Sequence, residues 1–288
     1  KDVQQFRFDT WDTYDWYLRL GSLATVNDSI LEGRIPTWND FARRPNYDAF
    51  WQRQAMKGYL ARVTVPTLNV AGWWDQEDFY GPITIYRELE RRDTGQQNFL
   101  VVGPWNHGGW MRGDGSSLGP IQFGQATGPF FRDSIMAPFF AEHLHQRGAL
   151  HLAEATVFEA GSNTWRRYDA WPPRAGVTPQ AYYFRERGRL STEPPPRSPA
   201  ASAAREFDSY VSDPNKPVPY RARPIPATYD PRGSGWSTWL TEDQRFVHNR
   251  PDVLSYDTGV LGEDLTIAGD ISVTIHAATT GSDADWIV

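Results

Sequence analysis

Two groups of ionisable side chains follow two short apolar runs of the sequence. Asp75 comes shortly after the run 67–71, and His107 shortly after the run 99–102. Between the runs, residues 82–92 begin with proline and are followed by a glycine, which is typical of a helix. A strand, helix, strand unit of this kind has parallel strands with a right-handed connection. Because neighbouring strands lie about 5 Å apart, we expect Asp75 and His107 to meet at the carboxyl edge of the sheet, where catalytic groups gather.

An acid and a histidine held in this way can transfer protons. The carboxylate orients the imidazole, which takes a proton from a nucleophile and returns it to the leaving group. The acid precedes the histidine in this chain, which is the order found in α/β-hydrolases. The alternative is that Asp75 and Asp78 favour the amino end of the following helix, and that His107 is an ordinary loop histidine.

Acidic residues are concentrated around Asp75. Asp75, Glu77 and Asp78 lie in the aromatic-rich segment GWWDQEDFY, residues 72–80. Carboxylates this close repel one another in a partly dry pocket unless a cation lies between them. The cluster therefore favours binding of a positively charged ligand. The alternative interpretation is that these residues are solvated acids at the start of a helix.

These segments resemble a known family. Residues 65–78 and 103–107 are similar to the α-amino-acid ester hydrolases, which are related to cocaine esterase and X-Pro dipeptidyl-peptidase. The similarity extends to residues 14–18, 242–246 and 281–286, so it is not confined to one motif. It implies a partial α/β-hydrolase domain with the remnant of a helical cap, followed by a truncated all-β jelly roll.

The resemblance also implies roles for the residues above. Asp75 matches the acid of a Ser-His-Asp triad, and His107 matches its general base. Glu77 and Asp78 match the positions that hold the α-ammonium group of the substrate. The nucleophilic serine does not align, and in the family it lies upstream of the cap. We therefore expect the chain to be a fragment whose serine lies outside it, and to be inactive alone.

One serine fits the letters of a nucleophile motif. Residues 115–119 read Gly-x-Ser-x-Gly, with Ser117 at the nucleophile position. A nucleophile elbow needs a buried strand before the serine and a helix after it. Residues 112–115 are polar, and Pro120 follows at once, so we expect a surface loop instead.

The function that follows is a serine hydrolase or acyltransferase acting on a small-molecule ester or amide. The resemblance points to α-amino-acid esters, and by extension to β-lactam side-chain amides. The alternatives are a related acylase or X-Pro dipeptidyl-peptidase, or an inactive fragment with a ligand-binding jelly roll. The resemblance further implies a periplasmic or secreted homo-oligomer, with a cytoplasmic location as the alternative.

The pattern along the chain divides it into three parts. Residues 1–60 are rich in aromatic residues at helical spacing and contain a second helical segment, 47–59, that Asn46 can cap. Residues 61–149 hold the second half of the α/β-hydrolase domain. Residues 150–288 contain the short β runs 156–158, 181–184 and 271–275, which suggest the incomplete jelly roll.

Composition excludes several classes of protein. Of the 288 residues, 40% are hydrophobic, which is too many for a disordered chain. The net charge is −6, and the sequence has no long run of one sign, so it does not predict a basic surface for nucleic acid or an anionic membrane. The absence of cysteine excludes disulfides and thiolate metal sites. His143 and His145 form His-x-His, but on a helix they point about 200° apart, so we expect no metal and no cofactor.

Overall fold

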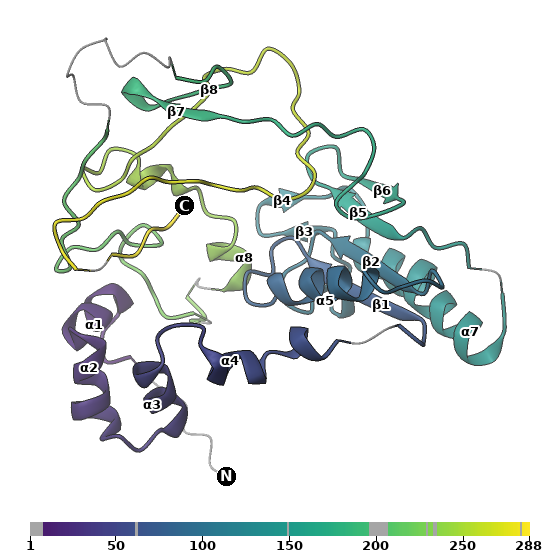
Figure 1. The fold of residues 1–288 in the computed structure, drawn as a ribbon, viewed down its shortest axis with the longest axis horizontal. Coiled ribbons are helices and arrows are strands. Elements are labelled where there is room, and N and C mark those ends of the chain that lie inside the picture. The colour runs from purple at the N-terminus through teal and green to yellow at the C-terminus, as the bar shows by residue number, and fades with distance from the viewer. Residues whose placement is uncertain are drawn as a thin grey trace.

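The computed structural model describes residues 8–60, 63–148, 150–195, 207–228, 230–232, 235–282 and 284–288. Its centre is a four-stranded sheet in the order β1-β2-β5-β6 (Figure 1). The strands are β1 (Thr67–Gly72), β2 (Asn98–Gly103), β5 (Ala155–Glu159) and β6 (Thr164–Tyr168). Strands β1, β2 and β5 are parallel, and β6 is antiparallel to β5. The expected α/β class is confirmed.

Helix α5 (Tyr80–Glu90) is the crossover between β1 and β2. The two strands pair in parallel with Gly72 opposite Gly103, so they end at the same level. The expected strand, helix, strand unit is therefore confirmed. The helix begins at Tyr80 rather than at Pro82, which falls in its first turn, where the missing N–H of proline has no intrahelical partner to lose.

One face of the sheet packs against α5. Successive residues of a strand point to opposite faces, so Leu100 and Val102 belong to the buried cluster on the α5 side, whereas Val101 belongs to the cluster on the other side. Ile83 and Tyr86 are the buried side chains that α5 contributes.

The opposite face is covered by three consecutive helical elements. These are α6 (Thr127–Phe131), the π-helical turn η4 (Arg132–Met136) and α7 (Ala137–His145). Phe131 and Ile135 are buried in the same cluster as Val101. Both faces of the sheet are therefore covered, which leaves its carboxyl edge for functional groups.

Strand β5 links the C-terminal part of the chain to the α/β sheet. The sequence assigns the run 156–158 to the C-terminal β domain, and in the structure this run pairs in parallel with β2, with Thr156 opposite Val101. Ala155 and Val157 are buried in the same cluster as Leu100. The α/β sheet thus continues past the expected boundary at residue 149. A buried parallel strand and a sandwich strand are equally apolar, so the run itself does not indicate which sheet it joins.

The described residues before the sheet are largely helical, as expected. The elements are α1 (Thr13–Leu20), α2 (Leu23–Thr25), the π-helical η1 (Val26–Leu31), α3 (Pro36–Arg43), α4 (Ala49–Gln54) and the 3₁₀ turn η2 (Met56–Tyr59). The cap expected at Asn46 is wrong, because Asp48 accepts a hydrogen bond from the backbone N–H of Phe50 and caps α4. Asn and Asp cap helices about equally well, so residue type could not choose between them.

The C-terminal part contains little regular structure. Its elements are β7 (Tyr183–Arg185), η5 (Glu186–Gly188), β8 (Arg189–Ser191), α8 (Trp236–Trp239) and η6 (Gln244–Val247). Residues 271–275, expected to be a strand, belong to no strand ladder, and Ile271 is 76% exposed. Among the described residues these elements do not pair into a jelly roll, so that architecture stays a prediction.

Helix α1 is tied to the C-terminal part. The carbonyl of Ile225 accepts hydrogen bonds from the backbone N–H and the hydroxyl of Thr13, at 2.8 and 2.9 Å. Asp12, which caps α1, accepts from the N–H of Ile225 at 3.0 Å and pairs with Arg223 at 2.8 Å. The chain then returns toward the sheet, where α8 lies close to β3 (Ser117–Leu118), because a Cβ built on Gly119 would lie 2.5 Å from the carbonyl oxygen of Ser237 (Figure 1). No helix in the described ranges is long and apolar enough to cross a membrane.

Candidate active site

The backbone after β1 holds Asp75 beside the loop that follows β2. The N–H groups of Trp73 and Trp74 donate to the carbonyls of Gly103 and Trp105, at 2.9 and 3.0 Å. The N–H of Asp75 donates to the carbonyl of Gly72 at 3.0 Å and closes a tight turn. The parallel pairing is thus extended beyond the strand ends, which fixes the position of the Asp75 side chain.

His107 reaches the same edge from the end of β2. The residue after it, Gly108, has a φ of +66°, a left-handed conformation that favours glycine. The chain then enters the 3₁₀ turn η3 (Gly109–Met111). The reversal at Gly108 leaves the imidazole of His107 free to face Asp75.

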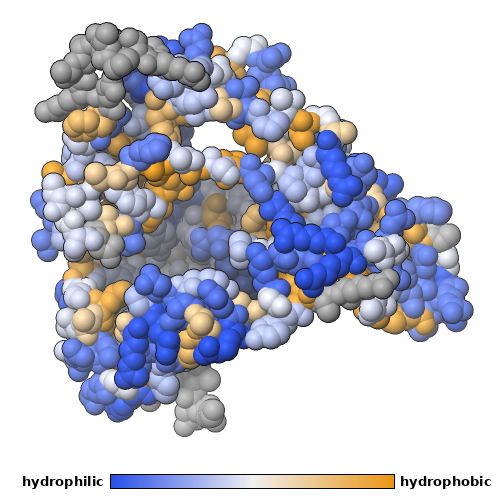
Figure 2. All heavy atoms as spheres, in the orientation of Figure 1, coloured by the Kyte–Doolittle hydropathy of each residue, from blue (hydrophilic) through white to orange (hydrophobic). Residues whose placement is uncertain are grey.

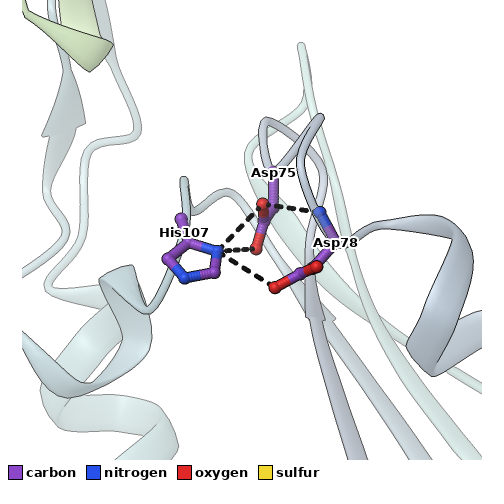
Figure 3. A group of neighbouring side chains, drawn as sticks. All are labelled: Asp75, Asp78 and His107. Carbon is purple, nitrogen blue, oxygen red and sulfur yellow. Dashed lines mark hydrogen bonds and ion pairs between the residues drawn. The ribbon is translucent and has the colours of Figure 1, made fainter. Parts of the chain in front are cut away.

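Asp75 and His107 are in contact, as the sequence predicts. The Nδ1 atom of His107 lies 3.2 and 3.4 Å from the two carboxylate oxygens of Asp75 (Figure 3). The side chain of Asp75 is 4% exposed, and that of His107 is 40% exposed. The buried acid also accepts the N–H of Asp78 at 3.1 Å, which holds its orientation. The other ring nitrogen of His107 points away from the acids (Figure 3), where a nucleophile could approach it.

Glu77 and Asp78 lie around the same ring nitrogen. The shortest carboxylate distances from Nδ1 of His107 are 3.4 Å for Asp78 and 3.8 Å for Glu77. The side chain of Asp78 is 62% exposed, and that of Glu77 is 54% exposed. The structure therefore brings together all four residues that the sequence singled out. One of the three acids is buried, and the other two are exposed to solvent.

The geometry of three of these groups would also admit a cation. Asp75, Asp78 and His107 each offer an atom within 4.8 Å of the others. The same contacts are those that an acid and a base need for proton transfer. His143 and His145 lie in α7 and take no part in this group.

Aromatic residues of the C-terminal part complete the surroundings of the pair. The ring of Trp236 stacks over His107, with centroids 6.3 Å apart and planes 20° apart. A neighbouring cavity of about 360 Å³ is lined by Trp73, Trp74, Gln76, Tyr220, Trp239, Leu240 and Gln244. The face shown in Figure 2 is hollowed in the region where Figure 1 shows α8. Sequence reasoning missed Trp236 and Trp239, because nothing in the sequence relates α8 to a loop so far away along the chain.

Ser117 does not lie on a nucleophile elbow. It is exposed in β3 (Ser117–Leu118), which turns through Pro120 into β4 (Ile121–Gln122). The absence of a helix after Ser117 confirms the rejection of this motif, although the segment is a short hairpin rather than the expected loop.

The fold and the contact between Asp75 and His107 define a class of protein. An acid and a histidine that follow adjacent parallel strands, in this chain order, are the arrangement of the α/β-hydrolases. The comparisons with known proteins agree. Residues 4–109 match the family model described as X-Pro dipeptidyl-peptidase (S15 family), and residues 148–288 match the X-Pro dipeptidyl-peptidase C-terminal non-catalytic domain.

Individual proteins and solved structures that are similar to this chain support the same assignment. Cocaine esterase from Rhodococcus sp. (strain MB1 Bresler) is 28% identical over 274 residues, which are 92% of this chain and 45% of the esterase. The crystal structure of an aminopeptidase from the marine sediment archaeon Thaumarchaeota archaeon has a TM-score of 0.77 and 41% identity, covering 88% of this chain and 41% of that one. A selenomethionine-labelled α-amino acid ester hydrolase has a TM-score of 0.79 and 35% identity, covering 91% of this chain and 43% of that one.

The chain belongs to the X-Pro dipeptidyl-peptidase (S15) family of serine hydrolases. Asp75 and His107 both fall inside the segment that matches the S15 model. The chain spans less than half the length of these relatives.

Proposed function

We propose that the protein is a serine hydrolase that transfers the acyl group of α-amino-acid esters to water. The contact of 3.2 Å between Asp75 and Nδ1 of His107 carries this proposal. With Nδ1–H donated to the buried carboxylate, the imidazole presents its other nitrogen, Nε2, as a base. The esterase and ester hydrolase activities named for the relatives support an ester as the substrate.

The reaction proceeds in two acyl transfers. A serine from outside the described residues loses its proton to Nε2 of His107 as it attacks the ester carbonyl. The imidazolium, stabilised by Asp75, returns that proton to the departing alcohol. Water then attacks the acyl-enzyme with the help of the same base. An amine in place of water yields an amide. The reverse reaction cleaves an amide, and on this ground we include β-lactam side-chain amides among the substrates.

Glu77 and Asp78 select the amino group of the acyl part. Their carboxylates are exposed beside His107, and no described residue forms an ion pair with either except His107 itself. An α-ammonium group placed between them would relieve their mutual repulsion. A substrate with a neutral acyl group has no such partner to offer.

The experiment compares two esters, using the protein produced from the complete coding sequence that contains these residues. L-alanine methyl ester and methyl propionate differ only in the ammonium group. We expect a higher kcat/KM for the amino ester, and Glu77→Gln should reduce that preference. His107→Ala should lower turnover on both esters by on the order of 1,000-fold or more.

The outcomes separate the two assignments. Equal rates on both esters, unchanged by Glu77→Gln, would remove the ammonium site and leave the triad intact. A mild loss in His107→Ala would remove His107 from the catalytic machinery.

A second candidate is cleavage of a peptide bond, which the name of the family and the 41% identical aminopeptidase favour. Alanyl-proline p-nitroanilide tests this activity directly. If it is a better substrate than L-alanine methyl ester, the protein is a proline-specific peptidase. If neither compound is hydrolysed but amino-acid esters bind in calorimetry, the chain acts as a binding module.

We also propose that the protein is exported to the periplasm or the medium and that it forms a homo-oligomer. Cell fractionation tests the location, and light scattering tests the oligomeric state.

A further inference from the structure

A second cavity lies against His107, formed by different residues from the acidic cluster. Its volume is about 340 Å³, and its wall consists of the loop after β2 and the segment 112–118. The three acids around Nδ1 of His107 are not part of that wall. His107 therefore has the acidic cluster beside Nδ1 and also borders a cavity that this cluster does not line.

Arg112 is the cation of this second cavity. Its guanidinium lies against the backbone beside His107, because its Nη2 atom is 3.1 Å from the position of a Cβ built on Gly108. Among the described residues, Arg112 makes no ion pair and no side-chain hydrogen bond. Arg132 differs, since its guanidinium donates to the carbonyls of Trp110 and Gly113 and so serves the fold.

The one acid in the cavity wall does not neutralise Arg112. The Oδ1 atom of Asp114 accepts hydrogen bonds from the backbone N–H and the hydroxyl of Ser116, both at 3.0 Å. These bonds hold the carboxylate within its own loop. Arg112 is thus left as an unpaired guanidinium in a concave site, next to the residue that delivers the proton to a leaving group.

We propose that Arg112 binds a carboxylate on the leaving group of the substrate. The site would then accept α-aminoacyl compounds whose leaving group is an anion, such as a dipeptide with a free C-terminal carboxylate. The inference rests on the proposed function, with the ammonium group beside Glu77 and Asp78 and the leaving group on the Arg112 side of His107. The planar guanidinium can donate two parallel hydrogen bonds to a carboxylate, which a neutral leaving group cannot receive in the same way.

The test uses two peptides with the protein from the complete coding sequence. Alanyl-glycine and alanyl-glycinamide differ only in the carboxylate. We expect wild-type protein to prefer the free acid by about 1.5- to 5-fold in kcat/KM and in Kd by calorimetry, the range of an exposed ion pair. Arg112→Gln should bring both ratios to about 1 by weakening binding of the acid alone. Arg112→Lys should retain part of the preference, because the charge remains.

Two further variants sharpen the result. Asp114→Asn removes the negative charge from the cavity wall and should increase the preference for the acid. Arg147→Gln removes one positive charge, as Arg112→Gln does, but at an exposed residue just beyond the end of α7, and it should leave the ratio as it is in the wild type. The preference should also fall as salt is raised to 1 M, since the Debye length shrinks to about 3 Å.

The assignment is overturned if the wild type treats the two peptides alike, or if Arg112→Gln leaves the ratio unchanged. Failure of the proposed function is visible separately as a lack of turnover of L-alanine methyl ester. The ratio of Kd values for the two peptides still decides the role of Arg112 in that case, and an absence of binding by both peptides counts against it.

Discussion

Gly72, the last residue of β1, lies directly against Trp105 in the loop after β2. A Cβ added to Gly72 would lie 2.3 Å from the carbonyl oxygen of Trp105. That carbonyl accepts the N–H of Trp74 at 3.0 Å. The close approach of the two backbones sets the separation of the loops that carry Asp75 and His107, and only glycine allows it.

Replacing Gly72 by Ala should therefore disturb both stability and the site. The clash is with backbone, so no side-chain rotation relieves it, and we expect a loss of about 1–3 kcal/mol in the free energy of unfolding. Urea unfolding measures the loss. Gly81→Ala, in the first turn of α5 with open space around it, is the matched control and should be neutral or slightly stabilising. If both variants unfold at the wild-type midpoint, the contact with Trp105 does not constrain the loops.

The buried carboxylate of Asp75 should matter more to turnover than any exposed neighbour. Asp75→Asn keeps an oxygen for the N–H of Asp78 but removes the charge that orients and stabilises the imidazole of His107. We expect kcat on methyl propionate to fall on the order of 1,000- to 10,000-fold, with little change in thermal stability. Asp78→Asn, at the exposed acid, should cost far less with this neutral ester. A larger loss in Asp78→Asn than in Asp75→Asn would reverse their assigned roles.

Glu154 should make stability depend on pH. Burial, followed by hydrogen bonding with Glu90, raises the pKa of Glu154 from 4.5 to about 7, and Tyr86 donates its hydroxyl to it at 2.8 Å. The folded protein therefore holds a proton between pH 4.5 and 7 that the unfolded chain has released. This contribution to stability is complete below pH 4.5 and is lost as the pH rises to about 7.

The variant Glu154→Gln mimics the protonated form at every pH. Its free energy of unfolding should match that of the wild type at pH 4.5 and exceed it at pH 8 by on the order of 1 kcal/mol after solvent screening, which thermal or urea unfolding measures. Glu159→Gln is the opposite control, because a hydrogen bond from Arg166 lowers the pKa of Glu159. It should lose stability at pH 8. The same pH dependence in Glu154→Gln as in the wild type would show that another group is responsible.

Asp12 should connect the helical segment to the C-terminal part. Its carboxylate caps α1, accepts the N–H of Ile225 and pairs with Arg223. Asp12→Ala should cost about 2–4 kcal/mol, the sum of a lost cap and an unsatisfied N–H. Asp9→Ala removes an exposed pair with Arg19 and should cost less than about 1 kcal/mol. Chemical denaturation compares the two, and equal losses would mean that Asp12 acts only as a surface charge.

The sequence alone determined the strand, helix, strand unit and the meeting of Asp75 with His107. Both follow from local patterns: apolar runs of strand length, a helix start at proline, and a crossover rule that makes the strands parallel. Chain order and two adjacent strand ends then suffice to bring the acid and the histidine together. The side-chain contacts of Glu77 and Asp78 with His107 follow from the same short segment.

The tertiary structure alone decided what lies far apart along the chain. Strand β5 pairs with β2 of the α/β sheet, because hydrogen bonds to β2 and burial with Leu100 select its partner, and a short apolar run fits either sheet equally well. The ring of Trp236 stacks over that of His107, although the two residues lie far apart along the chain. Arg112 lines a cavity beside His107, which its place in the sequence does not indicate. Such pairings depend on packing between distant segments, and no local spacing encodes them.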